Sequence, residues 1–188
     1  FLADMVRLYG DSSAMMRLRM LETSYGWAVQ AGASQRGARI FCPIWQDTGP
    51  NGELYWMTFN QDTYSGDLLD QLGGENVFSG RERRYPLAAD LSAAPAEASN
   101  GRDTRYPRVN RAEILAAQPE VILLPDEPYA FDDDAEKIIR ARLAETPAVC
   151  NQRVYRVEGR WITWCGTCIG EAILELPRFL AAEWEEKL

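Results

Sequence analysis

Apolar side chains recur every three to four residues through the first part of the chain. This stripe lies within residues 12–31 and consists of Ala14, Met15, Leu18, Leu21, Tyr25, Ala28 and Val29. The spacing places these residues on one face of a helix. Asp11 or Ser12 can cap its start, and Gly32 can end it. We therefore predict one long helix at the start of the chain, with residues 1–7 also helical.

Strand-like and helix-like segments alternate after this helix. The predicted strands cover residues 38–44, 54–59, 76–78, 120–124, 152–157 and 160–164. The predicted helices cover residues 63–72, 110–117 and 169–187, and a further helix opens at residues 132–134. Residues 79–107 show no periodicity, so we expect a long surface loop there. The continuous apolar run at residues 120–124 is typical of a strand buried in a parallel sheet. The alternation predicts an α/β sandwich with a mostly parallel sheet.

Turn and cap residues mark several boundaries of these segments. Asn110 and Glu113 have the spacing of a capping box. The carboxylates of residues 132–134 suit the positive end of a helix dipole. Glu158-Gly159 is typical of a two-residue hairpin turn, and Pro177 is expected to bend the last helix.

Composition narrows the classes of function. The chain has 188 residues, a formal net charge of −8 and no histidine. An acidic surface repels phosphate backbones, so we expect no nucleic-acid binding. The lack of His removes His-based triads and the commonest metal ligand. No run of about 18 apolar residues is present, so no membrane-inserted segment is predicted. The chain starts with Phe1 inside helix-like sequence, and we expect it to be a piece of a longer protein.

Four cysteines are present, and two of them lie in the motif Trp164-Cys165-Gly166-Thr167-Cys168. This motif is similar to the active site of thioredoxin-like oxidoreductases, where a helix N-terminus stabilises a thiolate. Only 20 residues follow Cys168, which is enough for one helix but not for the strands that fold needs. The context favours a disulfide or two free thiols lining a pocket. A zinc site would need two more ligands, such as Cys42 and Cys150, which lie far apart in the sequence.

Four stretches of the chain carry a family resemblance. They are Trp56-Met57-Thr58-Phe59-Asn60 with Gly73-Gly74 and Asn76-Val77-Phe78; Asn110 and Glu113 with Gln118-Pro119-Glu120-Val121-Ile122-Leu123-Leu124; Pro125-Asp126-Glu127-Pro128-Tyr129-Ala130-Phe131; and Val154-Tyr155-Arg156-Val157 with Trp164-Cys165-Gly166-Thr167. In this order they resemble the helical-backbone metal receptors, the class III periplasmic substrate-binding proteins of ABC importers for cobalamin, haem and ferric siderophores. Two positions depart from that family. Cys168 stands where the branch usually has Arg, and Ala112 stands where members tend to have a Glu that docks on the transporter.

The resemblance implies a protein of two lobes joined by one long helix. Residues 1–34 would be the bridging helix, and residues 35–188 would be the C-terminal α/β substrate-binding lobe, a three-layer sandwich. The chain would then lack a similar N-terminal lobe. We expect roughly another 80 to 120 residues upstream, from the usual size of such a domain.

In this architecture the ligand is contacted by loops at strand ends that face the cleft between the lobes. The candidate ligand-binding residues are Trp45, Trp56, Phe59, Asp126, Glu127, Tyr129, Phe131, Trp164, Cys165 and Cys168. Aromatic faces would cover a flat chelate. Trp56 and Phe59 have equal claims to the hydrophobic core, and Trp161 is expected to pack there. Glu113 either docks on the transporter or only completes the capping box. No catalytic residue and no metal ligand is predicted.

The resemblance also implies a function: the substrate-binding component of an ABC importer, not an enzyme. The ligand would be cobalamin or a related metal chelate, such as haem or a ferric siderophore, with no resident cofactor. The protein partner would be the permease dimer of the transporter. The location would be periplasmic or extracellular and membrane-anchored, with the cytoplasm as the alternative because no signal peptide is visible. Two other functions stay open: a thioredoxin-like thiol-disulfide oxidoreductase that uses Cys165 and Cys168, and an intracellular corrinoid-binding protein.

Overall fold

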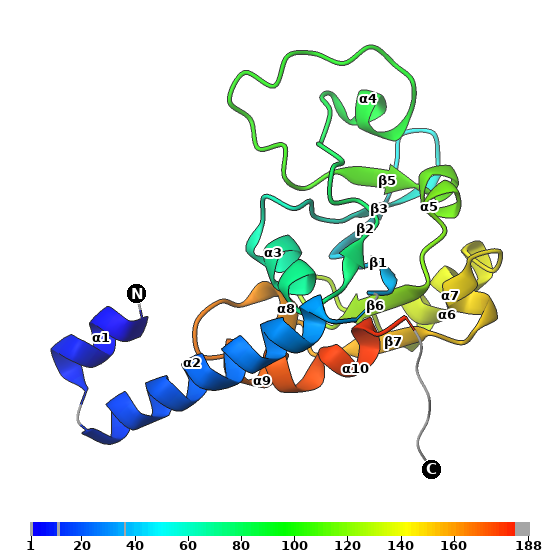
Figure 1. Ribbon diagram of the computed structural model, residues 1–188. Coiled ribbons are helices and arrows are strands. Elements are labelled where there is room, and N and C mark those ends of the chain that lie inside the picture. The colour runs from blue at the N-terminus through cyan, green and yellow to red at the C-terminus, as the bar shows by residue number, and fades with distance from the viewer. Residues whose placement is uncertain (1, 11, 36, 183–188) are drawn as a thin grey trace.

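The centre of the molecule is a parallel sheet with its middle strand buried on both faces. The computed structural model describes residues 2–10, 12–35 and 37–182. Its central strands are β1 (Arg39–Phe41), β4 (Glu75–Asn76), β6 (Val121–Pro125) and β7 (Val154–Val157), in the order β4-β1-β6-β7 (Figure 1). All three pairings are parallel, and every residue of β6 is buried. The predicted mostly parallel sheet, with its buried apolar strand, is confirmed.

Successive residues of the central strands point into two opposite layers. One layer holds α3 (Tyr64–Gln71), α8 (Arg160–Thr163), α9 (Ile169–Glu175) and α10 (Pro177–Leu180). The other holds α5 (Arg111–Ala117), α6 (Asp133–Arg142) and α7 (Pro147–Cys150). Val121 and Leu123 pack into the first layer, whereas Ile122 and Leu124 pack into the second. This alternation, which the period of two along a strand requires, confirms the three-layer sandwich.

The predicted long helix is α2 (Ser12–Ala33), preceded by the short α1 (Leu2–Tyr9). It packs on the first layer through Leu21, Tyr25 and Ala28, and none of its residues is buried. Near its end, a Cβ added to Gly32 would lie 2.6 Å from the carbonyl carbon of Leu72. Glycine therefore allows the helix to approach α3 this closely.

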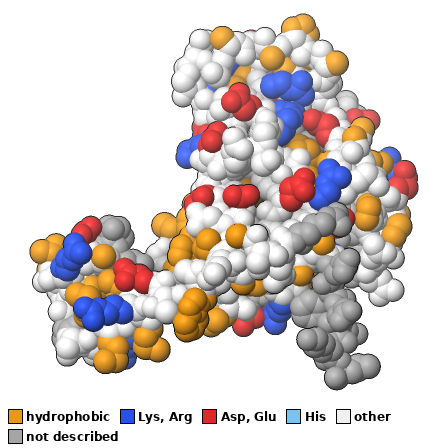
Figure 2. All heavy atoms as spheres, in the orientation of Figure 1, with side chains coloured by type: hydrophobic (Ala, Val, Ile, Leu, Met, Phe, Trp, Pro, Cys, Tyr) orange, Lys and Arg blue, Asp and Glu red, His pale blue; other side chains and the backbone are white. Residues whose placement is uncertain are grey.

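Figure 1 shows α1 and α2 extending away from the sheet, and Figure 2 shows hydrophobic side chains gathered along this arm. Within the described residues, no helix has the length and apolar character needed to cross a membrane.

A second, antiparallel sheet lies beside the first. Its strands are β2 (Trp45–Thr48), β3 (Leu54–Met57) and β5 (Arg108–Asn110), in that order. A turn at residues 49–52 closes the β2–β3 hairpin, and the Gly52 N–H donates to the Gly49 carbonyl at 2.9 Å. The sequence of β2 is largely polar and gave no strand signal. Pairing with β3 holds it in place, and Trp56 donates its indole N–H to Gln46 Oε1 at 2.8 Å.

Near the end of the chain, the predicted strand at residues 160–164 and the hairpin turn at Glu158-Gly159 are wrong, whereas the predicted bend of the last helix at Pro177 is confirmed. Residues 160–164 are not a strand, because Gly159 already has helical backbone angles and the chain continues into α8. Trp161 and Ile162 are adjacent in sequence and both are buried in the first layer, as predicted for Trp161. The last helix is broken into α9 and α10 at Leu176 and Pro177, and α10 ends at Leu180. The remainder of that prediction, residues 183–187, lies outside the described residues.

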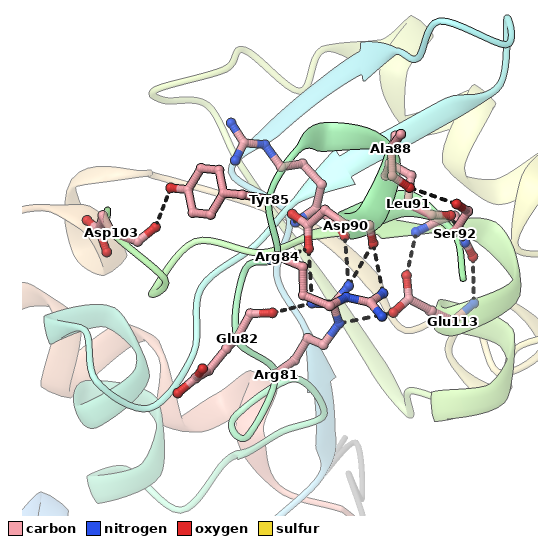
Figure 3. A network of polar contacts seen from close by, with 12 residues as sticks. Arg81, Glu82, Arg84, Tyr85, Ala88, Asp90, Leu91, Ser92, Asp103 and Glu113 are labelled. Atoms are coloured by element: carbon pink, nitrogen blue, oxygen red, sulfur yellow. Dashed lines mark hydrogen bonds and ion pairs between the residues drawn. The ribbon is translucent and has the colours of Figure 1, made fainter. Parts of the chain in front are cut away.

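A buried carboxylate organises the predicted loop at residues 79–107. Asp90, in α4 (Leu87–Leu91), is fully buried. Its Oδ1 accepts from Arg81 Nη1 at 3.0 Å and from the Arg84 N–H at 2.9 Å, and its Oδ2 accepts from the Arg108 N–H at 2.9 Å. Arg81 also donates to Glu113 Oε1 at 3.1 Å, so one guanidinium joins α4 to α5 (Figure 3). Because a buried charge is tolerated only when paired and hydrogen-bonded, this network fixes the segment against the second sheet.

Replacing Asp90 with Asn is expected to lower the free energy of unfolding by about 3 kcal/mol. An amide offers one acceptor oxygen where the carboxylate uses two, so at least one buried N–H loses its partner. Urea unfolding followed by circular dichroism measures the change. Asp103→Asn is the matched control, because Asp103 accepts from Arg105 at the surface and its loss should cost under about 1 kcal/mol. Equal stability of D90N and the wild type would contradict this role.

Candidate binding cleft

The carboxyl ends of the parallel strands bring three loops to one edge of the sheet. Residues 42–44 follow β1, residues 126–131 follow β6, and Glu158 follows β7. In open α/β sheets this edge is where ligands usually bind. The candidates Asp126, Glu127, Tyr129 and Phe131 lie on the loop after β6, and Trp45 directly follows the loop after β1. The parallel order of the strands brings these loops together.

A cavity of about 370 Å³ opens among these loops. Its lining residues are Ile44, Ser65, Tyr106, Glu127, Pro128, Thr163 and Trp164. Two of the lining hydroxyls are already engaged, since Ser65 donates to the Ile162 carbonyl at 2.8 Å and Thr163 donates to the Gly159 carbonyl at 2.9 Å. The wall is therefore mainly aromatic and aliphatic, and Glu127 is its one charged side chain among the described residues.

Asp126 positions the cleft but does not line this cavity. Its Oδ1 accepts from the Gly159 N–H at 2.6 Å, and its own N–H donates to the Val157 carbonyl at 3.2 Å. A Cβ on Gly159 would lie 2.6 Å from the Glu127 carbonyl oxygen and would also collide with the Glu127 side chain. Only glycine lets the turn after β7 lie this close to the loop after β6. The contact of Gly159 with Asp126 and Glu127 thus fixes where α8 starts, and with it the position of Trp164 just after α8.

The candidate aromatic residues divide into exposed and buried groups. Trp45 is 42% exposed and meets the Tyr129 ring edge-on, with ring centroids 5.7 Å apart. Trp164 is 58% exposed at the mouth of the cavity. By contrast, Trp56, Phe59 and Phe131 are almost fully buried in the two hydrophobic clusters. These three rings pack in the core, and Phe131 also lines a second cavity of about 480 Å³ together with Asp126. Their contact with a ligand stays a prediction.

Five lining residues lay outside the candidate list: Ile44, Ser65, Tyr106, Pro128 and Thr163. Tyr106 comes from the end of the long segment before β5, where Thr58 N–H donates to the Pro107 carbonyl at 3.0 Å. The sequence showed an Arg-Tyr-Pro tripeptide there but no strand-end signal. Ile44 and Pro128 are the chain neighbours of the candidates Trp45 and Tyr129, and the candidates Glu127 and Trp164 line the cavity themselves.

All four cysteines are free thiols in this structure. Cys42 is buried in the first layer, and burial raises the pKa of its thiol. Cys150 is exposed at the end of α7 and donates to the Ala144 carbonyl at 3.3 Å. Cys165 is exposed and directly follows Trp164, whereas Cys168 is half-buried at the start of α9. Among the described residues, no group of three Cys, Asp or Glu side chains is arranged to hold a metal ion.

Glu113 completes the capping box of α5. Its Oε2 accepts from the Asn110 N–H at 3.2 Å, and Asn110 Oδ1 accepts from the Glu113 N–H at 2.9 Å. Its other carboxylate oxygen accepts from Arg81. The capping role is confirmed, while docking through Glu113 stays a prediction.

The fold described here is shared with periplasmic substrate-binding proteins of known structure. A periplasmic binding protein of Veillonella parvula superposes with a TM-score of 0.66 at 18% identity, over 98% of this chain and 57% of its own. The haem-binding protein RhuT of Roseiflexus sp. RS-1 gives 0.61 at 14% identity, over 93% of this chain and 58% of its own. The vitamin B12 binding protein BtuF of Vibrio cholerae gives 0.54 at 20% identity, over 89% of this chain and 50% of its own.

The chain therefore spans between half and three fifths of the length of these structures. No protein-family model matches the sequence, and no curated protein matches it. At these identities the likeness is one of fold, and at that level it confirms the resemblance seen in the sequence.

Replacing Gly159 with Ala is expected to lower the free energy of unfolding by about 1 to 3 kcal/mol, because the added methyl overlaps backbone that cannot easily move. The emission spectrum of Trp164 should shift at the same time, since the turn that positions it must open. Thermal unfolding and tryptophan fluorescence measure both effects. Gly80→Ala is the matched control, because nothing lies within 4 Å of a Cβ there. Unchanged stability in G159A would show that the close approach is not required.

Proposed function

We propose that this chain is part of the substrate-binding component of an ABC importer and is not an enzyme. The observation that carries the proposal is the cavity at the carboxyl edge of the sheet, in a fold shared with binding proteins for haem and vitamin B12. The chain would contribute one lobe and the bridging helix of a two-lobed protein. Its ligand would be cobalamin or a related metal chelate, such as haem or a ferric siderophore.

The chemistry of the cavity supports a flat, largely apolar ligand. Trp164 and Tyr106 offer ring faces, and Ile44 and Pro128 offer aliphatic surface. Such surfaces bind a macrocycle or chelate through dispersion and desolvation, while a few polar groups orient it. Glu127 adds negative charge, which disfavours a polyanionic ligand and suits a cationic or amide-rich one. Because the sequence has no histidine, we infer that the metal arrives already chelated.

The proposal places the protein in the periplasm or at the extracellular face, where such importers collect their substrates. Its protein partner would be the permease dimer. Glu113 would contact that partner only after giving up part of its capping box and its bond to Arg81.

Titration of the purified full-length protein with cobalamin, haem and ferric siderophores should quench tryptophan fluorescence for at least one of them. Trp164→Ala should weaken that binding about 30-fold, because truncating a large aromatic contact typically costs about 2 kcal/mol. Trp27→Ala is the matched control, since Trp27 is 70% exposed on α2 and lies outside the cavity. Unchanged emission with all three ligand classes would show that the ligand class is wrong.

The same protein should not catalyse insulin reduction by dithiothreitol, because the proposal assigns Cys165 and Cys168 to the wall of a cleft. The comparison is with the double variant Cys165→Ser/Cys168→Ser, and both forms should match the uncatalysed rate. Activity in the native protein that the double variant lacks would instead establish a thiol-disulfide oxidoreductase.

A further inference from the structure

Cys165 and Cys168 lie on either side of a sharp bend of the chain. The bend is centred on Gly166, whose φ of +93° lies in the left-handed region that favours glycine. The Ile169 N–H then donates to the Gly166 carbonyl at 3.2 Å, which closes the following turn. This turn runs from Gly166 to Ile169, so Cys165 directly precedes it and Cys168 lies within it. Two intervening residues at such a bend allow a disulfide, which needs Cα atoms within about 7 Å of each other.

The hydroxyl of Tyr64 lies beside this pair and lacks an acceptor. Its oxygen is buried and has no hydrogen-bond partner among the described residues. Burial, with the neighbouring Cys165 and Cys168 adding to it, raises the pKa of Tyr64 to about 12. The phenol therefore stays protonated at neutral pH and remains a donor. A buried donor without a partner is costly, and a thiolate at either cysteine would supply the acceptor.

We propose that Cys165 and Cys168 are a modification site that reacts with small-molecule disulfides and closes into a reversible intramolecular disulfide. The exposed Cys165 thiolate attacks one sulfur of the disulfide RSSR, forming a mixed disulfide and releasing RS⁻. Cys168 then attacks Cys165 Sγ, forming the Cys165–Cys168 bond and releasing the second RS⁻. The two protons of the cysteine thiols pass to the released thiolates, so one RSSR gives two RSH.

The other two cysteines cannot perform this pair of steps. Cys42 is buried, and burial keeps its thiol protonated. Cys150 is exposed but lies on α7, away from the bend, and its thiol donates to a backbone carbonyl. Cys150 can form a mixed disulfide, yet it has no second thiol to resolve it. Cys150 is therefore an internal control, because it is an exposed cysteine without a nearby second thiol.

Closure of the disulfide would also move the cavity wall. Trp164 precedes Cys165 directly and lines the cavity with more than half of its surface exposed. A new covalent bond across the bend restrains the backbone that carries this ring. The reaction itself does not depend on what the cleft binds, so a failed ligand titration would leave it standing.

The test treats the purified, reduced protein with oxidised glutathione and measures intact mass. The wild type should keep one glutathione adduct, at Cys150, and lose two further free thiols without added mass. Cys165→Ser and Cys168→Ser should each carry a second, trapped adduct at the remaining cysteine. Cys150→Ser should form the intramolecular bond with no adduct. A wild type that holds stable adducts at Cys165 or Cys168, or that keeps both thiols free, would overturn the proposal.

Tyr64→Phe tests the hydrogen-bond donor separately. Without this phenol, a thiolate at the reacting cysteine has no buried donor to bind, so alkylation at neutral pH should slow about tenfold. The pH profile of iodoacetamide labelling measures this change, and Cys150 in the same protein is the internal control. A profile that is unchanged at Cys165 and Cys168, in a variant that folds like the wild type, would overturn the role of Tyr64.

Discussion

The structure depends on burying both faces of β6. Its five residues are all buried, and its neighbours β1 and β7 satisfy its backbone hydrogen bonds in parallel. Such a strand needs a layer of helices on each side, because neither face can meet water. The parallel order then forces its carboxyl end, with Asp126 and Glu127, to the same edge as the ends of β1 and β7. The position of the cleft follows from that one requirement.

The wall of the cleft that contains Tyr106 is stabilised by other interactions than the hydrophobic core. Tyr106 lies on a segment that is joined by backbone hydrogen bonds to the residues after β3, including Asn60 N–H to the Arg105 carbonyl at 2.9 Å. Behind it, Asp90 and Arg81 secure residues 79–107 through charge-assisted hydrogen bonds. One wall therefore rests on apolar packing and the other on a buried polar network. Polar networks of this kind fail abruptly when a single member is removed.

Most of the fold could be predicted from residue patterns, because long apolar periodicities leave few choices. Three patterns each fit only one type of element. They are the apolar stripe of α2, the apolar run of β6 and the Asn110–Glu113 capping box. The segment after Glu158-Gly159 does not, since that dipeptide suits a hairpin as well as a helix start. Contact between Gly159 and Glu127, which are distant in sequence, decides between them. Likewise, only three-dimensional packing shows that Trp56 and Phe131 are core while Trp45 and Trp164 are exposed.

The one-sided attachment of α2 has a mechanical consequence. Its 22 residues extend over about 33 Å at 1.5 Å per residue. Leu21, Tyr25, Ala28 and Gly32 make contacts with the lobe, and they extend from the tenth residue of the helix to its last turn. Residues 12–20, about 14 Å of helix, project beyond these contacts, and a rotation of roughly 5° at Leu21 moves their far end by about 1 Å. The close contact between Gly32 and Leu72, at the end of α3, therefore helps to set the direction in which α2 extends from the lobe.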